Sequence, residues 1–311
     1  MPRFPHVSSA SEGLTDGVFS RLAARAKERG GRVLPLHVGD TWLEPLEAAR
    51  AEAQRTESHP RLHNYAPVQG EPALIDAILR HVDRRAGVTL ERERVQVMSG
   101  ATAGLSVIAD AMLEPGEEVI VPAPFWPLIR GTVRRRGARP IEVPFFDRLR
   151  DPAFDPERAL EDRIGPRTVA IYVNTPHNPT GVMLSSRALE AIGRVAARHD
   201  LWIFCDEVYE DLYFTPEPPE PAWTRPDFRE RAIVVHSLSK AYGLAGARVG
   251  FAHGPAEAMT AIRGVQTFST YCAPRPMQHG AAKALDEGGS WLAEARRLYH
   301  EAAIATADAF G

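Results

Sequence analysis

Seven short apolar segments, most of them separated by longer helical segments, place the strongest limit on what this chain can fold into. Several are apolar throughout, which is typical of strands that are buried on both faces. Helices between such strands provide the crossovers that a parallel sheet needs. We therefore predict an α/β fold with a mostly parallel sheet covered by helices on both faces. The predicted strands lie within residues 95–100, 118–124, 139–145, 168–176, 201–209, 232–239 and 248–254.

One connection is too short for this pattern. Only about eight residues separate the sixth apolar segment from the seventh, which leaves no room for a crossover helix. We therefore expect the last strand to run antiparallel to the one before it, with Lys240 in the turn between them. Outside the sheet, residues 19–30, 71–87 and 290–310 have the periodicity of helices.

Length, charge and cysteine content exclude several classes of protein. A chain of 311 residues can bury a sizeable core, and its net charge of -3 lacks the basic surface that nucleic acids require. We find neither a signal segment nor an apolar run long enough for a membrane span. Two cysteines are too few for a disulfide framework. These features predict a cytoplasmic enzyme with no nucleic-acid or membrane partner.

Polar and aromatic residues gather where the predicted strands end. The carboxyl ends of parallel strands meet at one edge of a sheet, and active sites of α/β proteins lie there. Each residue alone has an ordinary structural explanation, but together they define a candidate site. They are Gly100, Trp126, Asn178, Asp206, Tyr209 and Lys240.

A phosphate could bind after the first strand. There the backbone N–H groups of Gly100, Ala101 and Thr102 would point out of a helix N-terminus. Such turns also carry glycine and threonine for packing and capping. Arg248 and Ser237 would supply the further charge and hydroxyl contacts.

A flat, charged ring would suit the fifth strand. Asp206 lies in an apolar segment, so its carboxylate needs a partner, either a buried structural pair or the protonated nitrogen of a pyridine. Tyr209 could reach the same ligand, and the Asn178 amide could donate to a ring oxygen. Trp126 could stack on the ring or simply fill the core.

Lys240 is the natural reactive group of this set. Near Arg248 and a phosphate site its pKa should be lowered, which would make it an amine nucleophile able to form a Schiff base. An exposed lysine in a serine-rich loop is the alternative, although it leaves the companion residues unexplained.

Five ordered motifs identify a family. The chain resembles the fold-type I pyridoxal-phosphate enzymes, specifically the class I and II aminotransferases, over roughly residues 30 to 290. The resemblance implies a three-layer α/β sandwich, the large domain of aspartate aminotransferase-like transferases, with a seven-stranded mixed sheet and one antiparallel strand. The motifs are "NYAPVQGEPALIDAI", "SGATAGL", "HNPTG", "CDEVYEDL" and "SLSKAYGLAGARVGF".

The resemblance also implies domain limits. Residues 1–44 would form an N-terminal arm and part of a small domain, residues 45–288 the large cofactor-binding domain, and residues 289–311 an interdomain helix. Family members usually continue for roughly a further hundred residues into a small domain that carries a carboxylate-binding arginine. We therefore expect this chain to lack that domain and to leave the apolar side of its last helix, including Trp291, Leu292 and Leu298, without its usual cover.

The family assigns roles to the motif residues. Lys240 would form the Schiff base with pyridoxal 5'-phosphate, and Asp206 would pair with the ring nitrogen. Tyr209 and Asn178 would hold the phenolic oxygen, and Trp126 would stack on the ring. The residues implied for the phosphate are Gly100, Ala101, Thr102, Ser237, Ser239 and Arg248.

Two further residues concern the substrate and a second subunit. Tyr65 matches a tyrosine that reaches the phosphate of the neighbouring subunit, which implies a homodimer. Gly39 matches a segment that touches the substrate carboxylate, and Asn178 would also contact the substrate.

The resemblance implies a ping-pong reaction that moves an amino group from an α-amino acid to a 2-oxo acid. A carbon-sulfur β-lyase of the same fold would keep every cofactor residue, because the two chemistries diverge only after the α-proton is lost. A non-catalytic cofactor-binding protein is the alternative from a different class.

Overall fold

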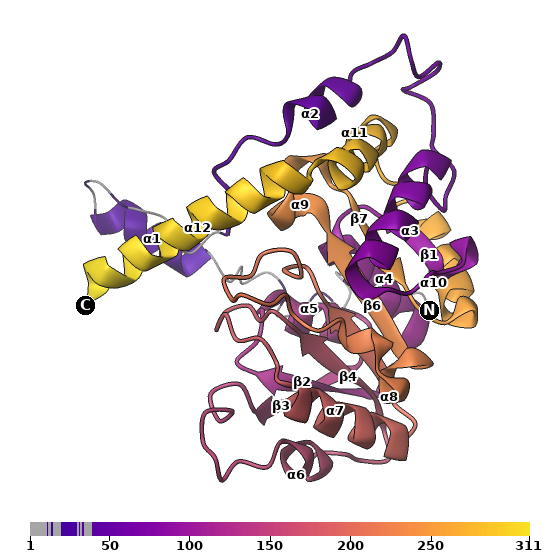
Figure 1. The fold of residues 1–311 in the computed structure, drawn as a ribbon. Coiled ribbons are helices and arrows are strands. Elements are labelled where there is room, and N and C mark those ends of the chain that lie inside the picture. The colour runs from indigo at the N-terminus through magenta and orange to yellow at the C-terminus, as the bar shows by residue number, and fades with distance from the viewer. Residues whose placement is uncertain (1–10, 12–13, 15–19, 30, 32, 34–38) are drawn as a thin grey trace, which may run out of the picture.

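A single seven-stranded sheet organises the chain from residue 95 onward (Figure 1). The computed structural model describes residues 39–311 and, before them, residues 11, 14, 20–29, 31 and 33. Each of the seven predicted segments contains one strand. The strands are β1 (Val95–Met98), β2 (Glu118–Ala123), β3 (Arg139–Pro144), β4 (Thr168–Asn174), β5 (Trp202–Asp206), β6 (Ala232–Ser237) and β7 (Gly250–His253).

The strand order is β1-β7-β6-β5-β4-β2-β3. The pairs β2/β3, β2/β4, β4/β5 and β5/β6 are parallel, whereas β7 runs antiparallel to both of its neighbours, β6 and β1. The short connection after β6 contains the four-residue helix α9 (Leu238–Ala241), too short to cross a sheet face. The predicted mixed sheet with one antiparallel strand is therefore confirmed.

Helices cover both faces of this sheet. Alternate residues of each strand join different buried clusters: Ile171 and Val173 of β4 lie with one set of helices, and Ala170 and Tyr172 with the other. The first set is α3 (Pro72–Ala86), α7 (Ser186–Arg198) and α11 (Arg275–Glu287), and the second is α4 (Ala101–Met112), α5 (Leu128–Arg135) and α10 (Ala256–Ser269). Two apolar layers on one sheet form the predicted three-layer sandwich.

Shorter elements complete the chain. The predicted helices near the two ends are present, although Gly30, expected to end the first of them, lies outside the described residues. The remaining elements are α1 (Ser20–Arg29), α2 (Glu47–Glu52), η2 (Arg92–Arg94), α6 (Pro156–Glu161), η3 (Ala222–Thr224), α8 (Pro226–Arg229), η4 (Ala245–Ala247) and α12 (Gly289–Phe310). Among all described helices, none combines the length and apolar composition that crossing a bilayer requires.

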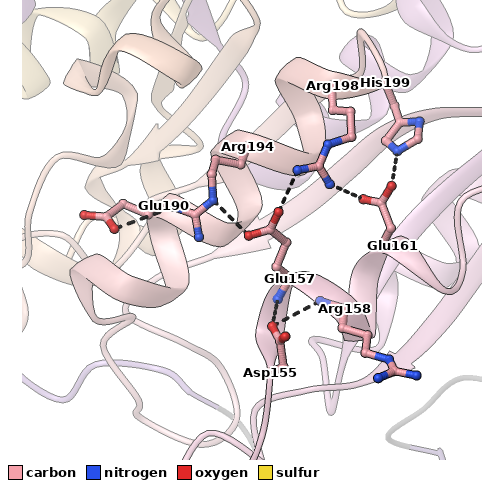
Figure 2. A network of polar contacts seen from close by, with 8 residues as sticks. All are labelled: Asp155, Glu157, Arg158, Glu161, Glu190, Arg194, Arg198 and His199. Atoms are coloured by element: carbon pink, nitrogen blue, oxygen red, sulfur yellow. Dashed lines mark hydrogen bonds and ion pairs between the residues drawn. The ribbon is translucent and has the colours of Figure 1, made fainter.

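Charged side chains fasten α6 to α7 on the outside of the sandwich (Figure 2). Glu157 bridges Arg194 and Arg198 at 2.8 Å each, and Arg198 also reaches Glu161 at 3.0 Å. The Asp155 carboxylate caps α6 by accepting from two of its backbone N–H groups. Because these pairs are largely exposed, each contributes little to stability. They orient α6, and none of them lines the cavity described below.

The last helix, α12, extends away from the sandwich (Figure 1). Its first turns are nevertheless covered: Leu292 is buried in the core cluster that includes Leu285 of α11, and Trp291 Nε1 donates to the Glu44 carbonyl at 3.2 Å. The expectation of missing cover is therefore wrong for Leu292, which is buried in the same cluster as residues of α11, whereas Trp291 and Leu298 are only half-buried. The domain limits at residues 44 and 288 stay a prediction.

Candidate active site

A cavity of about 660 Å³ opens at the carboxyl edge of the parallel strands. The structure places all of the predicted site residues on its walls except Gly100 and Tyr65. The predicted residues that line it are Gly39, Ala101, Thr102, Trp126, Asn178, Asp206, Tyr209, Ser237, Ser239, Lys240 and Arg248.

Sheet register brings these residues together. Asn174, at the end of β4, lies opposite Asp206, at the end of β5. Asp206 in turn lies opposite Val235 of β6, two residues before Ser237. Because the three strands are parallel and adjacent, their last residues open onto the same cavity.

Asp206 is the most buried acid of the cavity wall, with 5% of its surface exposed. Its carboxylate accepts a hydrogen bond from Tyr172 Oη at 2.6 Å and one from the Val208 backbone N–H at 3.3 Å. Burial raises the pKa of Asp206 to about 6, and the Tyr172 hydrogen bond opposes that rise. Among the described residues no cationic side chain forms an ion pair with this carboxylate, so its charge is left for a ligand to neutralise.

Hydrogen bonds through two asparagine side chains connect Asp206 to Tyr209. Asn174 Nδ2 donates to the Asp206 carbonyl at 2.8 Å, and Asn174 Oδ1 accepts from the Asn178 backbone N–H at 2.8 Å. Asn178 Nδ2 then donates to Tyr209 Oη at 3.4 Å. Burial, and secondarily the Asp206 charge, raises the pKa of Tyr209. The Tyr209 phenol therefore remains a neutral hydrogen-bond donor.

The opposite end of the cavity is built for an anion. Helix α4 begins at Ala101 after Gly100, whose φ is 83°, and no side chain of the described residues caps it. Its first N–H groups are therefore free to bind a negative ligand. The Arg248 guanidinium lies directly against Gly100: a Cβ atom at Gly100 would stand only 2.5 Å from Arg248 Nη2. Gly100 thus admits the cation beside the helix end, although it does not itself line the cavity.

Lys240 stands between these two ends. It lies on α9, whose N-cap Ser237 accepts from the Ser239 backbone N–H at 3.1 Å, and Lys240 Nζ donates to the Gly39 carbonyl. Burial lowers the pKa of Lys240, Arg248 lowers it further, and Asp40 opposes the shift. The expected direction is confirmed, although burial outweighs the predicted effect of Arg248.

Tyr65 lies apart from this cavity. Its side chain is 82% exposed, and its ring meets that of Tyr271 edge-on, with centroids 5.2 Å apart. Within one chain the Tyr65 side chain therefore does not reach the cavity.

The donor set fits pyridoxal phosphate. A buried acid without a cationic partner suits a protonated pyridine nitrogen, and an uncapped helix N-terminus with an arginine suits a phosphate. An amine with a lowered pKa lies between them, where the cofactor's reactive carbon would be placed. The Trp126 indole lines the same cavity and is available to a flat ring.

Comparison with known proteins decides the family. The family model for aminotransferases of class I and II matches residues 32–309. The chain belongs to this family. It is therefore a pyridoxal-phosphate-dependent enzyme that transfers an amino group from an amino acid to an oxo acid.

Individual relatives of this aminotransferase agree with that assignment. The chain is 32% identical to the arginine–pyruvate transaminase of Pseudomonas aeruginosa, over 91% of its own length and 70% of that protein. It is also 32% identical to a probable aspartate/prephenate aminotransferase of Thermus aquaticus, over 95% of its length and 76% of that protein. The alternatives of a β-lyase and of a non-catalytic binding protein gain no support from these relatives.

Solved structures show the same fold. The N-succinyldiaminopimelate aminotransferase of Mycobacterium tuberculosis superimposes with a TM-score of 0.84 at 31% identity, covering 94% of this chain and 75% of that one. The aspartate aminotransferase of Thermus thermophilus with maleate gives 0.87 at 28% identity, covering 96% and 78%.

Three residues of the aminotransferase site were not found from the sequence. Tyr172 and Asn174 hold Asp206, and Asp40 lines the cavity beside Gly39. A tyrosine within an otherwise aliphatic buried strand could have signalled Tyr172, because a buried phenol needs a hydrogen-bond partner. Asn174 and Asp40 carry no comparable signal, since amides and acids are common where strands end.

Replacing Tyr172 with phenylalanine tests the hydrogen bond to Asp206. Because burial raises the Asp206 pKa from 3.8 to about 6, ionising this carboxyl costs stability as the pH rises through that window. Tyr172→Phe removes a donor to the charged form, so the variant should lose about 2 kcal/mol of unfolding free energy above pH 6 and less below about pH 4. Denaturant titration of the cofactor-free protein across this range measures both values.

Tyr242→Phe is the matched control. Tyr242 is also buried, with 5% exposed, and its hydroxyl makes no hydrogen bond within the described part of the chain. Its effect should change less with pH than that of Tyr172→Phe, because Asp211 and Glu210 act on Tyr242 through their charge and not through a hydrogen bond. An equal loss for Tyr172→Phe at both ends of the range would contradict the assigned role.

Proposed function

We propose that Lys240 binds pyridoxal phosphate covalently and transfers the substrate's proton in the amino-group exchange. One observation carries this proposal: Lys240, the buried Asp206 carboxylate and the uncapped start of α4 all face one cavity. The three groups correspond to the aldehyde carbon, the ring nitrogen and the phosphate of the cofactor.

Each remaining residue of the cavity would hold one part of the cofactor. Asp206 would pair with the ring nitrogen, Tyr209 and Asn178 would donate to the ring oxygen, and Trp126 would cover a ring face. The phosphate would bind to Gly100, Ala101, Thr102, Ser237, Ser239 and Arg248, with Ser239 the weaker contact. Gly39 and Asn178 would contact the substrate.

The chain's own groups supply the proton chemistry. When bound, the cofactor provides an electron-withdrawing ring next to the substrate's α-carbon. Because its pKa is lowered, Lys240 is neutral in a larger fraction of molecules and can take the α-proton and return it. Above its pKa of about 6, Asp206 is a carboxylate and favours positive charge on the group that it faces.

We also propose a homodimer in the cytoplasm that serves amino acid metabolism, including biosynthesis. The match of Tyr65 to a tyrosine that crosses to the neighbouring subunit supports the dimer, since within one chain Tyr65 lies apart from the cavity and is exposed. Both cysteines, Cys205 and Cys272, are unpaired, which is usual in a reducing compartment.

Lys240→Ala tests the covalent role. After incubation with pyridoxal phosphate and borohydride reduction, the parent protein should carry the cofactor on the peptide containing Lys240, and the variant should carry none there. Transamination should fall at least about a thousandfold. Mass spectrometry locates the adduct. Lys283→Ala, which removes a half-buried lysine that is paired with Glu287 and lines neither cavity, is the control and should behave like the parent. A reduced adduct at an unchanged level in Lys240→Ala would refute the assignment.

Gly100→Ala tests the phosphate end. The added Cβ would collide with the Arg248 guanidinium, so affinity for pyridoxal phosphate should fall at least about tenfold. Gly116→Ala is the matched control, because Gly116 has a similar φ of 90° but open space around its Cβ position. It should show comparable backbone strain with unchanged affinity. Equal affinities for the two variants would argue against a phosphate at this position.

Sedimentation tests the homodimer. The protein should sediment as a dimer, and Tyr65→Ala should weaken pyridoxal phosphate binding without releasing monomers, since one exposed side chain is a small part of an interface. If the parent protein is a monomer, Tyr65 cannot contact the phosphate of a neighbouring subunit.

A further inference from the structure

A second cavity, of about 810 Å³, adjoins the first. The two share six lining residues: Gly39, Asp40, Asn178, Pro179, Tyr209 and Lys240. The second cavity therefore starts at the reactive amine and continues away from Asp206, which lines only the first. A substrate whose amino group reaches Lys240 would have its side chain in this space.

The walls of the second cavity beyond Lys240 are mainly apolar and aromatic. Met183 comes from the loop after β4, Leu212 and Phe214 come from the segment after β5, and Tyr299 comes from α12. Met183 and the segment after β5 also touch each other, because Thr215 Oγ1 lies 3.6 Å from Met183 Sδ. Burial of an apolar ligand group against such a surface is favourable, because it removes apolar area from water.

Aromatic contacts hold these walls in place. Tyr299 stacks on Trp42 with ring centroids 5.3 Å apart, and Phe214 stacks on His300 at 5.1 Å. The Arg296 guanidinium lies 4.7 Å from the centre of the Tyr213 ring. Helix α12 is thus fixed both to the segment before α2 and to the segment after β5, so the cavity is formed before a ligand arrives.

The charges around the second cavity disfavour an ionised side chain. Among the described residues that line it, Lys240 is the only lysine or arginine. His177 also lines it, but burial lowers the pKa of His177 to about 4, so this ring is neutral at pH 7. Among the described lining residues, none beyond Lys240 would give a substrate carboxylate a cationic partner in exchange for its lost hydration; Arg296, which lies over the Tyr213 ring, does not line the cavity. Asp40 is the only acid among these lining residues, and its charge already acts on Lys240.

We propose that the second cavity receives the substrate's side chain and selects apolar, above all aromatic, amino acids over acidic and basic ones. The inference rests on the proposed function, since it takes Lys240 as the point where the amino group is exchanged. It adds the chemical class of the substrate. The benzyl group of phenylalanine offers a large flat surface to the cavity's own aromatic rings.

Binding of unreactive analogues to the protein loaded with pyridoxal phosphate tests this class. The probes are 3-phenylpropionate, succinate and 5-aminopentanoate, which share one carboxylate and differ at the other end. In titration calorimetry, 3-phenylpropionate should bind at least about tenfold more tightly than succinate or 5-aminopentanoate. Succinate or 5-aminopentanoate binding as tightly as 3-phenylpropionate, or no binding of any probe, would overturn the proposal.

A substitution in the cavity wall tests whether the second cavity determines which probe binds most tightly. Met183→Arg places a cation on a partly exposed wall position and should raise succinate affinity relative to 3-phenylpropionate at least about tenfold. Ala261→Arg adds the same charge on an exposed position of α10 that lines neither cavity, and its affinity ratio should equal that of the parent. An unchanged ratio in a folded Met183→Arg protein would place the side chain elsewhere. Should that variant not fold, the comparison of probes on the parent protein still decides.

Different results would refute the proposed function and this inference. If pyridoxal phosphate binds and an amino acid converts it to the amine form, the aminotransferase role stands whichever probe binds best. If no amino acid converts the bound cofactor, the proposed function itself is refuted.

Discussion

The site depends on the parallel register of β4, β5 and β6. Because Asn174 lies opposite Asp206, one amide can hold both the Asp206 carbonyl and the Asn178 backbone. A shift of one residue in that register would turn Asp206 toward the other face of the sheet. The register is in turn fixed by two apolar layers, so the core of the sandwich determines where the polar groups meet.

Burial tunes the two principal groups of the site in opposite directions. It raises the pKa of the Asp206 carboxyl and lowers that of the Lys240 amine, because removal from water disfavours the charged form of each. The Tyr172 hydrogen bond limits the first shift, and Asp40 limits the second. One cavity therefore contains a carboxyl group whose pKa is about 6 and an amine whose pKa is lowered. Pyridoxal phosphate chemistry uses this pair of groups.

Much of the site was predictable, and the parts that were not share a physical cause. Asp206, Lys240 and Gly100 stand out because each violates the local pattern: an acid in an apolar strand, a lysine in a turn too short for a crossover, and a glycine before a helix. Their supporting residues fit their local sequence and become visible only through contacts. Tyr172 reaches Asp206 across 34 positions of sequence, and Tyr299, near the C-terminal end, meets Trp42 of the N-terminal part of the chain.

The sequence by itself determined the class of fold, the order of the strands along the chain, the one reversed strand and the family of the enzyme. These follow from apolar periodicity, from connection lengths and from motifs of adjacent residues. Only the tertiary structure decided which groups hold Asp206, that burial is the main cause lowering the pKa of Lys240, that α11 covers Leu292, and that α12 lines an apolar cavity beside the amine. These properties depend on distances between segments far apart in sequence and on the exclusion of water, which only the packed chain establishes.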